Sequence, residues 1–144
     1  MPKNTFIERL NAALPAAMQT LRGRVFDFDR DQKTATLEFT ADATMCNPGD
    51  GVQGGFICGM LDAAMAYAVF SELGEYAIVA SLEIKISYLE ITRQGELKAT
   101  GTVIRSGKTV SFLDGELRNS DGTLLATATS TARIIRLDPT AARI

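Results

Sequence analysis

Histidine is absent from this chain of 144 residues, and its absence excludes several kinds of chemistry at once. Ser-His-Asp triads, Cys-His dyads and histidine-ligated metal centres all need an imidazole. A general acid or base must therefore be a carboxylate, lysine, tyrosine or cysteine. The two cysteines, Cys46 and Cys58, are too few for a disulfide framework and make a poor zinc set. We expect no metal, no cofactor and a reducing, cytoplasmic setting.

An excess of charge of one sign is also lacking. The 15 basic and 17 acidic residues give a formal net charge of −2, with no basic stripe, so no nucleic-acid partner is expected. The N-terminus carries charges where a signal peptide needs an apolar core. The apolar run around Asp62 is short and glycine-rich, and its acid opposes membrane insertion by about 3 kcal/mol, so no membrane span is expected. The length predicts one domain, 1–144.

Hydrophobic periodicity predicts the order of helices and strands. An amphipathic helix over 6–21 is broken or kinked at Pro15, because proline removes a helical hydrogen bond. A long apolar helix over 54–73 is closed by Gly74 and follows an irregular loop over 43–51. Alternation predicts strands near 24–29, 34–42, 78–88, 97–103, 109–118 and 124–134. This order predicts an α+β fold in which an antiparallel six-stranded sheet wraps around the long helix.

Finer features of the strands and turns are also expected. The turns are placed at Asp29–Gln32 and Asn119–Gly122. In the fifth strand, the apolar phase changes between Phe112 and Leu113, which indicates a bulge. In the third strand, alternation predicts a shared face for Ile78, Ala80, Leu82, Ile84, Ile86 and Tyr88, and the opposite face for Ser81, Glu83, Lys85 and Ser87.

The long helix combines a lone acid with a glycine-rich start. Asp62 is the only charged residue between Gly51 and Phe70, and an unpaired buried carboxylate is costly. The helix opens at Gly54-Gly55, where free backbone N–H groups can hold an oxyanion. A structural interpretation stays open for both features. Asp62 could face solvent or form an interface salt bridge, and the glycines could permit close packing on the sheet.

The order of polar residues around this helix resembles a known pattern. Asn47, Gln53-Gly54-Gly55 and Asp62 are similar to the active-site segment of hotdog-fold acyl-CoA thioesterases of the phenylacetic-acid-degradation, or PaaI-like, type. That family carries Asn or Gln, His-Gly-Gly, and an Asp or Glu nine positions after the histidine. A Ser or Thr follows near the start of the third strand. The resemblance covers about residues 14–135 and implies the hotdog fold.

The resemblance also implies a role for each residue. The N–H of Gly54 would stabilise the oxyanion, and Asp62 would act as nucleophile or general base. Asn47 would orient the water or the carbonyl, and Ser81, at the last place of the pattern, would hold the acid or the water. Gln53 departs from the family's histidine: it can donate a hydrogen bond but cannot titrate. Activity could therefore persist, slow or be lost.

Substrate contacts are expected at the glycine turn and at a distant hairpin. Basic residues at strand ends meet coenzyme A phosphates in related proteins, and the residues proposed here to bind substrate are Gly55, Ser81, Arg105, Ser106 and Lys108. Structural alternatives again stay open: Asn47 as an ordinary turn residue, Ser81 as a surface polar group, Gln53 as a plain polar residue at the helix start, and the hairpin as a solvated turn.

The spacing of Gly54 and Asp62 predicts a partner subunit. Eight residues of helix separate them by roughly 12 Å, which no aspartate side chain spans. Two such helices packed antiparallel about a two-fold axis would bring Asp62 of one subunit near Gly54 of the other. We therefore expect a homodimer at least, and the resemblance implies pairing into a homotetramer.

The expected activity is hydrolysis of an acyl-CoA in which coenzyme A is part of the substrate. Aryl and medium-chain acyl groups both suit apolar helix residues such as Phe56, Met60 and Tyr67. A non-catalytic acyl-CoA-binding hotdog protein is the main alternative, because of Gln53. A hotdog hydratase is disfavoured, since those enzymes pair a histidine with their acid.

Overall fold

The computed structural model describes residues 1–138, so the last six residues of the predicted domain lie outside the described part. The helical elements are α1 (Lys3–Ala12), α2 (Ala16–Thr20), the 3-10 turn η1 (Ala43–Met45) and α3 (Gly54–Leu73). The strands are β1 (Gly23–Asp29), β2 (Thr34–Ala41), β3 (Ala77–Tyr88), β4 (Gly95–Ser106), β5 (Val110–Asn119) and β6 (Leu124–Arg136). The predicted element order is confirmed.

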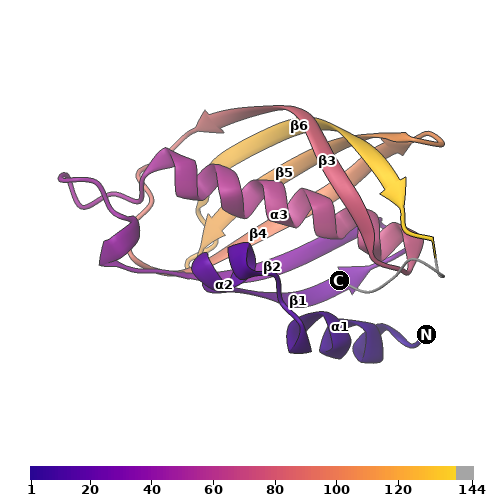
Figure 1. Ribbon diagram of the computed structural model, residues 1–144. Coiled ribbons are helices and arrows are strands. Elements are labelled where there is room, and N and C mark those ends of the chain that lie inside the picture. Colours follow the sequence, from indigo (N-terminus) through magenta and orange to yellow (C-terminus); the bar gives the residue numbers. More distant parts are fainter. Residues whose placement is uncertain (139–144) are drawn as a thin grey trace.

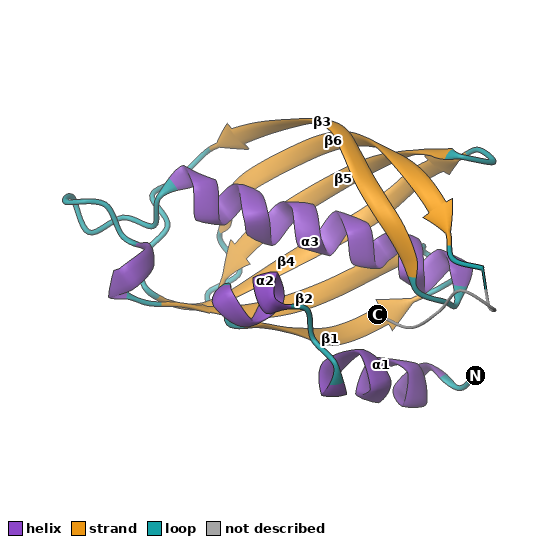
Figure 2. Ribbon diagram, viewed as in Figure 1, coloured by secondary structure: helices purple, strands orange, loops and turns teal. Residues whose placement is uncertain are grey.

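One antiparallel sheet curves around α3. The strand order is β1-β2-β4-β5-β6-β3, so β1 and β3 form the two edges. The sheet wraps the helix on its inner face, with the 46–52 loop projecting beyond the N-terminal end of α3 (Figures 1 and 2). This arrangement confirms the predicted α+β hotdog architecture.

The helix and the sheet approach each other most closely at β4. A Cβ placed on Gly101 would lie 2.2 Å from the backbone oxygen of Ala64 and 2.6 Å from the nitrogen of Met65. Glycine is therefore required there, because any side chain would push the helix away from the strand. Apolar residues of α3, such as Met60 and Leu61, are fully buried between these surfaces. Gly74 ends α3 in the left-handed conformation, at φ 71°, as expected.

By length and composition alone, α3 could cross a membrane. It has 20 residues, so the expectation that the apolar run is too short for a span is wrong. More than half of its most apolar stretch is nevertheless buried inside the protein, where the sheet covers it. Burial, rather than length, identifies α3 as the core helix of the described domain.

The N-terminal segment breaks where proline predicts and protects one edge of the sheet. Pro15 caps α2, three residues after α1 ends. The side-chain amide of Asn11 donates to the carbonyl of Val25 at 2.9 Å and accepts from its N–H at 2.8 Å. The edge strand β1 is therefore hydrogen-bonded to α1, and its register is also broken between Val25 and Asp27.

The predicted faces of β3 hold for Ile84 and Ile86, which share the core-facing side, but the expectation that Ile78 and Leu82 share it is wrong, because both are exposed. The register with β6 shifts between Ser81 and Glu83, because Leu82 is an extra residue in a bulge. Val79 packs toward the core before the bulge, and Ile84 and Ile86 do so after it. Regular alternation would have turned these two groups to opposite faces.

The predicted bulge in β5 is also wrong. Burial alternates without interruption along this strand, with Ser111 and Leu113 buried and Phe112 49% exposed. The bulge lies opposite, in β4, where Ile104 is extra between Val103 and Arg105. The sequence suggested a phase change because the exposed position holds an aromatic residue and the buried one a serine.

Candidate active site

The first turn of α3 presents two backbone amides. The carbonyl of Gln53 accepts from the N–H groups of Phe56 and Ile57, so the amides of Gly54 and Gly55 lie at the helix start without an intrahelical acceptor. The side chain of Gln53 is exposed and makes no capping hydrogen bond. This helix end therefore offers partial positive charge to an oxyanion.

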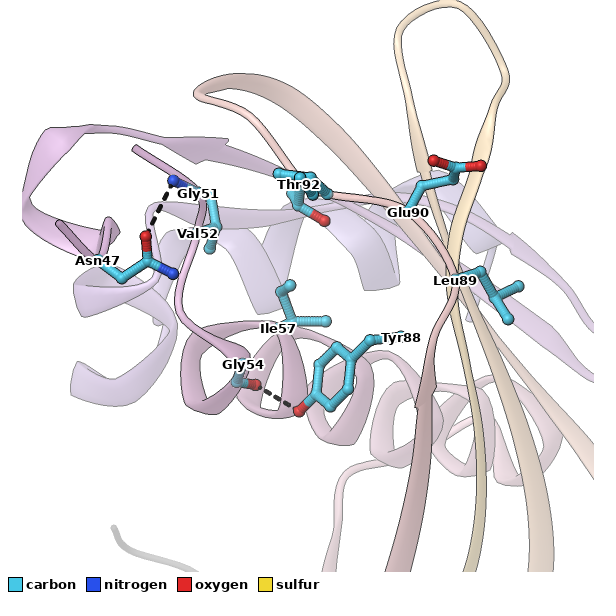
Figure 3. A pocket seen from close by; sticks show the side chains of 10 residues that line it. Asn47, Gly51, Val52, Gly54, Ile57, Tyr88, Leu89, Glu90 and Thr92 are labelled. Carbon is cyan, nitrogen blue, oxygen red and sulfur yellow. Dashed lines mark hydrogen bonds between the residues drawn. The ribbon is translucent and has the colours of Figure 1, made fainter. Parts of the chain in front are cut away.

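Asn47 organises the loop in front of that turn. Its side-chain oxygen accepts from the N–H groups of Gly49, at 2.9 Å, and Gly51, at 3.2 Å. It thus acts as a turn residue here, and its proposed contact with water or a carbonyl stays a prediction. Asn47 and Gly54 line the same open cavity of about 470 Å³ (Figure 3).

The connection from β3 to β4 forms the opposite wall of this cavity. The lining is mainly apolar and consists of Asn47, Gly51, Val52, Gly54, Ile57, Tyr88, Leu89, Glu90, Ile91 and Thr92. The Tyr88 hydroxyl donates to the carbonyl oxygen of Gly54 at 2.9 Å (Figure 3). Sequence reasoning assigned Tyr88 only to an apolar strand face. The sequence signal for the bulge in β3 is that the apolar residues Val79 and Ile84 are five positions apart, because an odd spacing places two residues on opposite faces of a regular strand.

Asp62 lies two turns of α3 beyond Gly54 and is paired with Ser81 of β3. The Ser81 hydroxyl donates to Oδ1 of Asp62 at 2.6 Å. A carboxylate oriented in this way retains lone pairs for a water proton or for attack on a carbonyl. Cys58 lies between the glycine turn and Asp62. Burial, and next the negative charge of Asp62, raise the pKa of its thiol, so Cys58 stays protonated and is a poor nucleophile.

The hairpin residues lie at the other end of α3. Ser106 donates to Glu72 at 2.6 Å and hydrogen-bonds with Ser111 at 2.7 Å. Burial favours the protonated form of Glu72, but the hydrogen bonds from Ser106 and Lys33 outweigh it and hold the pKa of this carboxyl below its usual value. Within one protomer, the structure does not bring Arg105, Ser106 or Lys108 to Gly54. Their proposed contact with phosphate stays a prediction.

The candidate residues thus form two groups on one helix. Gly54 and Asn47 border the cavity, and Gly55 follows Gly54 in the chain, whereas Asp62 and Ser81 form a pair roughly 12 Å along the helix axis. A Cβ on Gly54 would lie 2.8 Å from the Tyr88 hydroxyl, but a Cβ on Gly55 would meet nothing within 4 Å. Close packing therefore explains Gly54 and does not explain Gly55.

A helix-centred antiparallel sheet, with a glycine turn at the start of the helix and an acid two turns further along it, defines a hotdog thioesterase. Residues 51–126 match the family model described as "Thioesterase superfamily", and the chain belongs to this family of thioester hydrolases. No curated protein matches the sequence significantly.

Solved structures support the same assignment. A phenylacetic acid degradation-related protein of Ralstonia eutropha JMP134 is 30% identical, with a TM-score of 0.80, and the match covers 89% of this chain and 98% of that one. The E. coli PaaI protein of the phenylacetic acid degradation operon is 22% identical, with a TM-score of 0.78, covering 92% and 91%. A Haemophilus influenzae thioesterase, 21% identical over 91% of both chains with a TM-score of 0.80, shares the fold.

Proposed function

We propose that this protein hydrolyses the thioester of an aryl- or medium-chain acyl-CoA at a site shared between two subunits. The observation that carries the proposal is the Ser81–Asp62 hydrogen bond, which orients the only acid in the first half of α3, next to a sheet edge that no strand within residues 1–138 covers. The similarity to phenylacetic acid degradation-related proteins supports an aryl acyl group.

The edge strand β3 supports a second subunit. Asn11 covers the β1 edge at Val25, but β3, 12 residues long, has no strand on its outer side within residues 1–138. A long open edge favours pairing with another chain. A two-fold axis near β3 would bring Asp62 of one copy toward Gly54 of the other. Pairing of such dimers into tetramers and a cytoplasmic location are part of the proposal.

The chemistry proposed for this shared site is acyl transfer to water. Amides at the α3 N-terminus stabilise the negative charge that develops on the thioester oxygen. In the general-base route, a water oxygen bonds to the carbonyl carbon while Asp62 takes its proton. The C–S bond then breaks, and sulfur leaves with the electron pair as the coenzyme A thiolate. In the nucleophilic route, an Asp62 oxygen bonds to the carbonyl carbon and the C–S bond breaks, which gives a mixed anhydride and the coenzyme A thiolate; water then hydrolyses the anhydride to the free acid and the Asp62 carboxylate.

The cavity beside Gly54 is the proposed place for the acyl group. Its apolar walls include Val52, Ile57 and Leu89, which suit an aromatic ring or a medium aliphatic chain. Thiolates leave readily, so this reaction needs no strong general acid, and the lack of histidine is compatible with turnover.

The test is release of free thiol from a panel of aryl and aliphatic acyl-CoAs. The wild type is expected to turn over at least one member of the panel. Asp62→Asn should lower kcat by a factor of about 100 or more, because the amide can neither accept the proton nor attack. Full activity in Asp62→Asn would place the site elsewhere. Tight binding without turnover by the wild type would identify a non-catalytic acyl-CoA-binding protein instead.

A further inference from the structure

The bulge in β3 turns two side chains toward α3 that a regular strand would separate. Ser81 and Tyr88 are seven positions apart, and residues an odd number apart point to opposite faces of a regular strand. In this structure both hydrogen-bond with α3, Ser81 with Asp62 and Tyr88 with Gly54. The extra residue, Leu82, lies between them and corrects the alternation. One strand therefore contacts both groups of candidate residues.

The contact between Tyr88 and Gly54 is close and directional. The hydroxyl donates to the Gly54 carbonyl at 2.9 Å, and a Cβ on Gly54 would lie 2.8 Å from the same oxygen and 3.0 Å from Cζ. The tyrosine thus lies against the backbone of the first helical residue. The carbonyl that it binds belongs to the peptide group whose N–H is that of Gly55.

Other contacts of this turn restrain the peptide groups that precede the one joining Gly54 and Gly55. The N–H of Val52 donates to the Thr92 carbonyl at 2.8 Å, and the N–H of Gln53 donates to the Met45 carbonyl at 2.9 Å. The Gln53 side chain makes no capping bond. Glycine has the most backbone freedom of any residue, so Gly54-Gly55 is the part of the turn that most needs an anchor.

We propose that Tyr88 is a positioning residue for the Gly55 amide, one of the two oxyanion-binding amides at the start of α3. This inference rests on the proposed function and deepens it. Tyr88 fixes the orientation of the Gly54–Gly55 peptide group from outside the helix, so that the Gly55 N–H keeps its direction as charge develops on the thioester oxygen. Accepting a hydrogen bond at the carbonyl also polarises the N–H of the same peptide group, which makes it a stronger donor. The bulge at Leu82 then allows one strand to position both Asp62, through Ser81, and the Gly55 amide, through Tyr88.

The variant Tyr88→Phe removes the hydroxyl and keeps the ring. We expect kcat for thiol release to fall about fivefold, the rate equivalent of one ordinary hydrogen bond, with KM nearly unchanged. The matched control is Tyr76→Phe, at a tyrosine 44% exposed just beyond the C-terminal end of α3, where no change in kcat is expected. Tyr88 is 54% exposed, so its replacement leaves the core intact.

A spectroscopic measurement separates positioning from a general structural role. Benzoyl-CoA labelled with ¹³C at the thioester carbonyl is bound to Asp62→Asn, which prevents its hydrolysis. Hydrogen bonding to the amides should lower the infrared stretching frequency of the bound carbonyl relative to free benzoyl-CoA. In Asp62→Asn/Tyr88→Phe, this lowering should be smaller. Only bound, folded protein contributes to the bound band, so partial unfolding cannot imitate the effect.

The possible results distinguish the two proposals. An unchanged kcat in Tyr88→Phe, together with the same carbonyl frequency in Asp62→Asn/Tyr88→Phe as in Asp62→Asn, would overturn the role of Tyr88 while the thioesterase function stands. If the wild type releases no thiol and the bound carbonyl shows no shift in Asp62→Asn, the proposed function fails, and the role of Tyr88 fails with it.

Discussion

Asp62 and Ser81 show how a single hydrogen bond defines a candidate catalytic group. The carboxylate is half-buried on α3, and the 2.6 Å bond from the Ser81 hydroxyl fixes one of its oxygens. The other oxygen remains for chemistry. If the carboxylate rotated freely, the reaction would be slower, because both proton transfer and attack need a correctly oriented oxygen. Ser81 is therefore expected to act through Asp62.

Removing this hydroxyl gives the first test at the residue scale. In Ser81→Ala, kcat for acyl-CoA hydrolysis should fall roughly tenfold, because a hydrogen bond to a charged group is worth more than a neutral one. Steady-state kinetics of thiol release measure the effect. Ser120→Ala, in the exposed β5–β6 turn, is the control and should match the wild type. Equal rates in both variants would show that Ser81 does not orient the acid.

At the scale of elements, the close contact between α3 and β4 fixes the position of the helix on the sheet. Gly101 allows the helix backbone to lie directly on the strand, and a Cβ placed on Gly115 of β5 would lie 3.2–3.5 Å from side-chain atoms of Leu61 and Met65. This contact holds α3 at a fixed height above the sheet. It consequently sets the distance from Asp62 and Gly54 to β3, whose side chains bind them.

Gly101→Ala should destabilise the protein strongly. The new Cβ would lie 2.2 Å from the Ala64 oxygen, so helix and strand would have to separate, at a cost of about 3 kcal/mol. Urea unfolding at fixed protein concentration measures the loss. The control is Gly107→Ala, whose Cβ would meet nothing closer than 3.4 Å, and its free energy of unfolding should stay within about 0.5 kcal/mol of the wild type. Equal stability of both variants would refute the close contact.

At the scale of the whole molecule, the two sheet edges differ. Asn11 from α1 satisfies the Val25 backbone at the β1 edge, whereas β3 carries the Asp62–Ser81 pair next to an edge with no further strand in the described protomer. Gly54 and Asp62 are too far apart along one helix to act on the same carbonyl. Both observations favour assembly through β3.

A complementation experiment tests the shared site. Asp62→Asn and Gly54→Ala should each be inactive, the second because its Cβ would lie 2.8 Å from the Tyr88 hydroxyl and displace the turn. In a mixed dimer, one of the two sites would combine an intact Asp62 with an intact Gly54. Co-expression should therefore restore about a quarter of wild-type activity if subunits mix at random. No restoration, despite mixed dimers seen by native mass spectrometry, would place each site within one subunit.

The sequence by itself determined the order of elements and the residues with unusual chemistry. Helical and strand periods, together with Pro15 and Gly74, predicted the helices and strands because these signals are local. Asp62 was found because a lone charge in an apolar run is conspicuous.

Only the tertiary structure decided which side chains meet. The bulge at Leu82 turns Tyr88 onto Gly54, and the fold joins Ser106 to Glu72 at the far end of α3. Strand phase after a bulge depends on pairing with β6, whose residues lie more than 40 positions away along the chain from the bulge. Local sequence does not encode such long-range register. The positions of these side chains follow from the register.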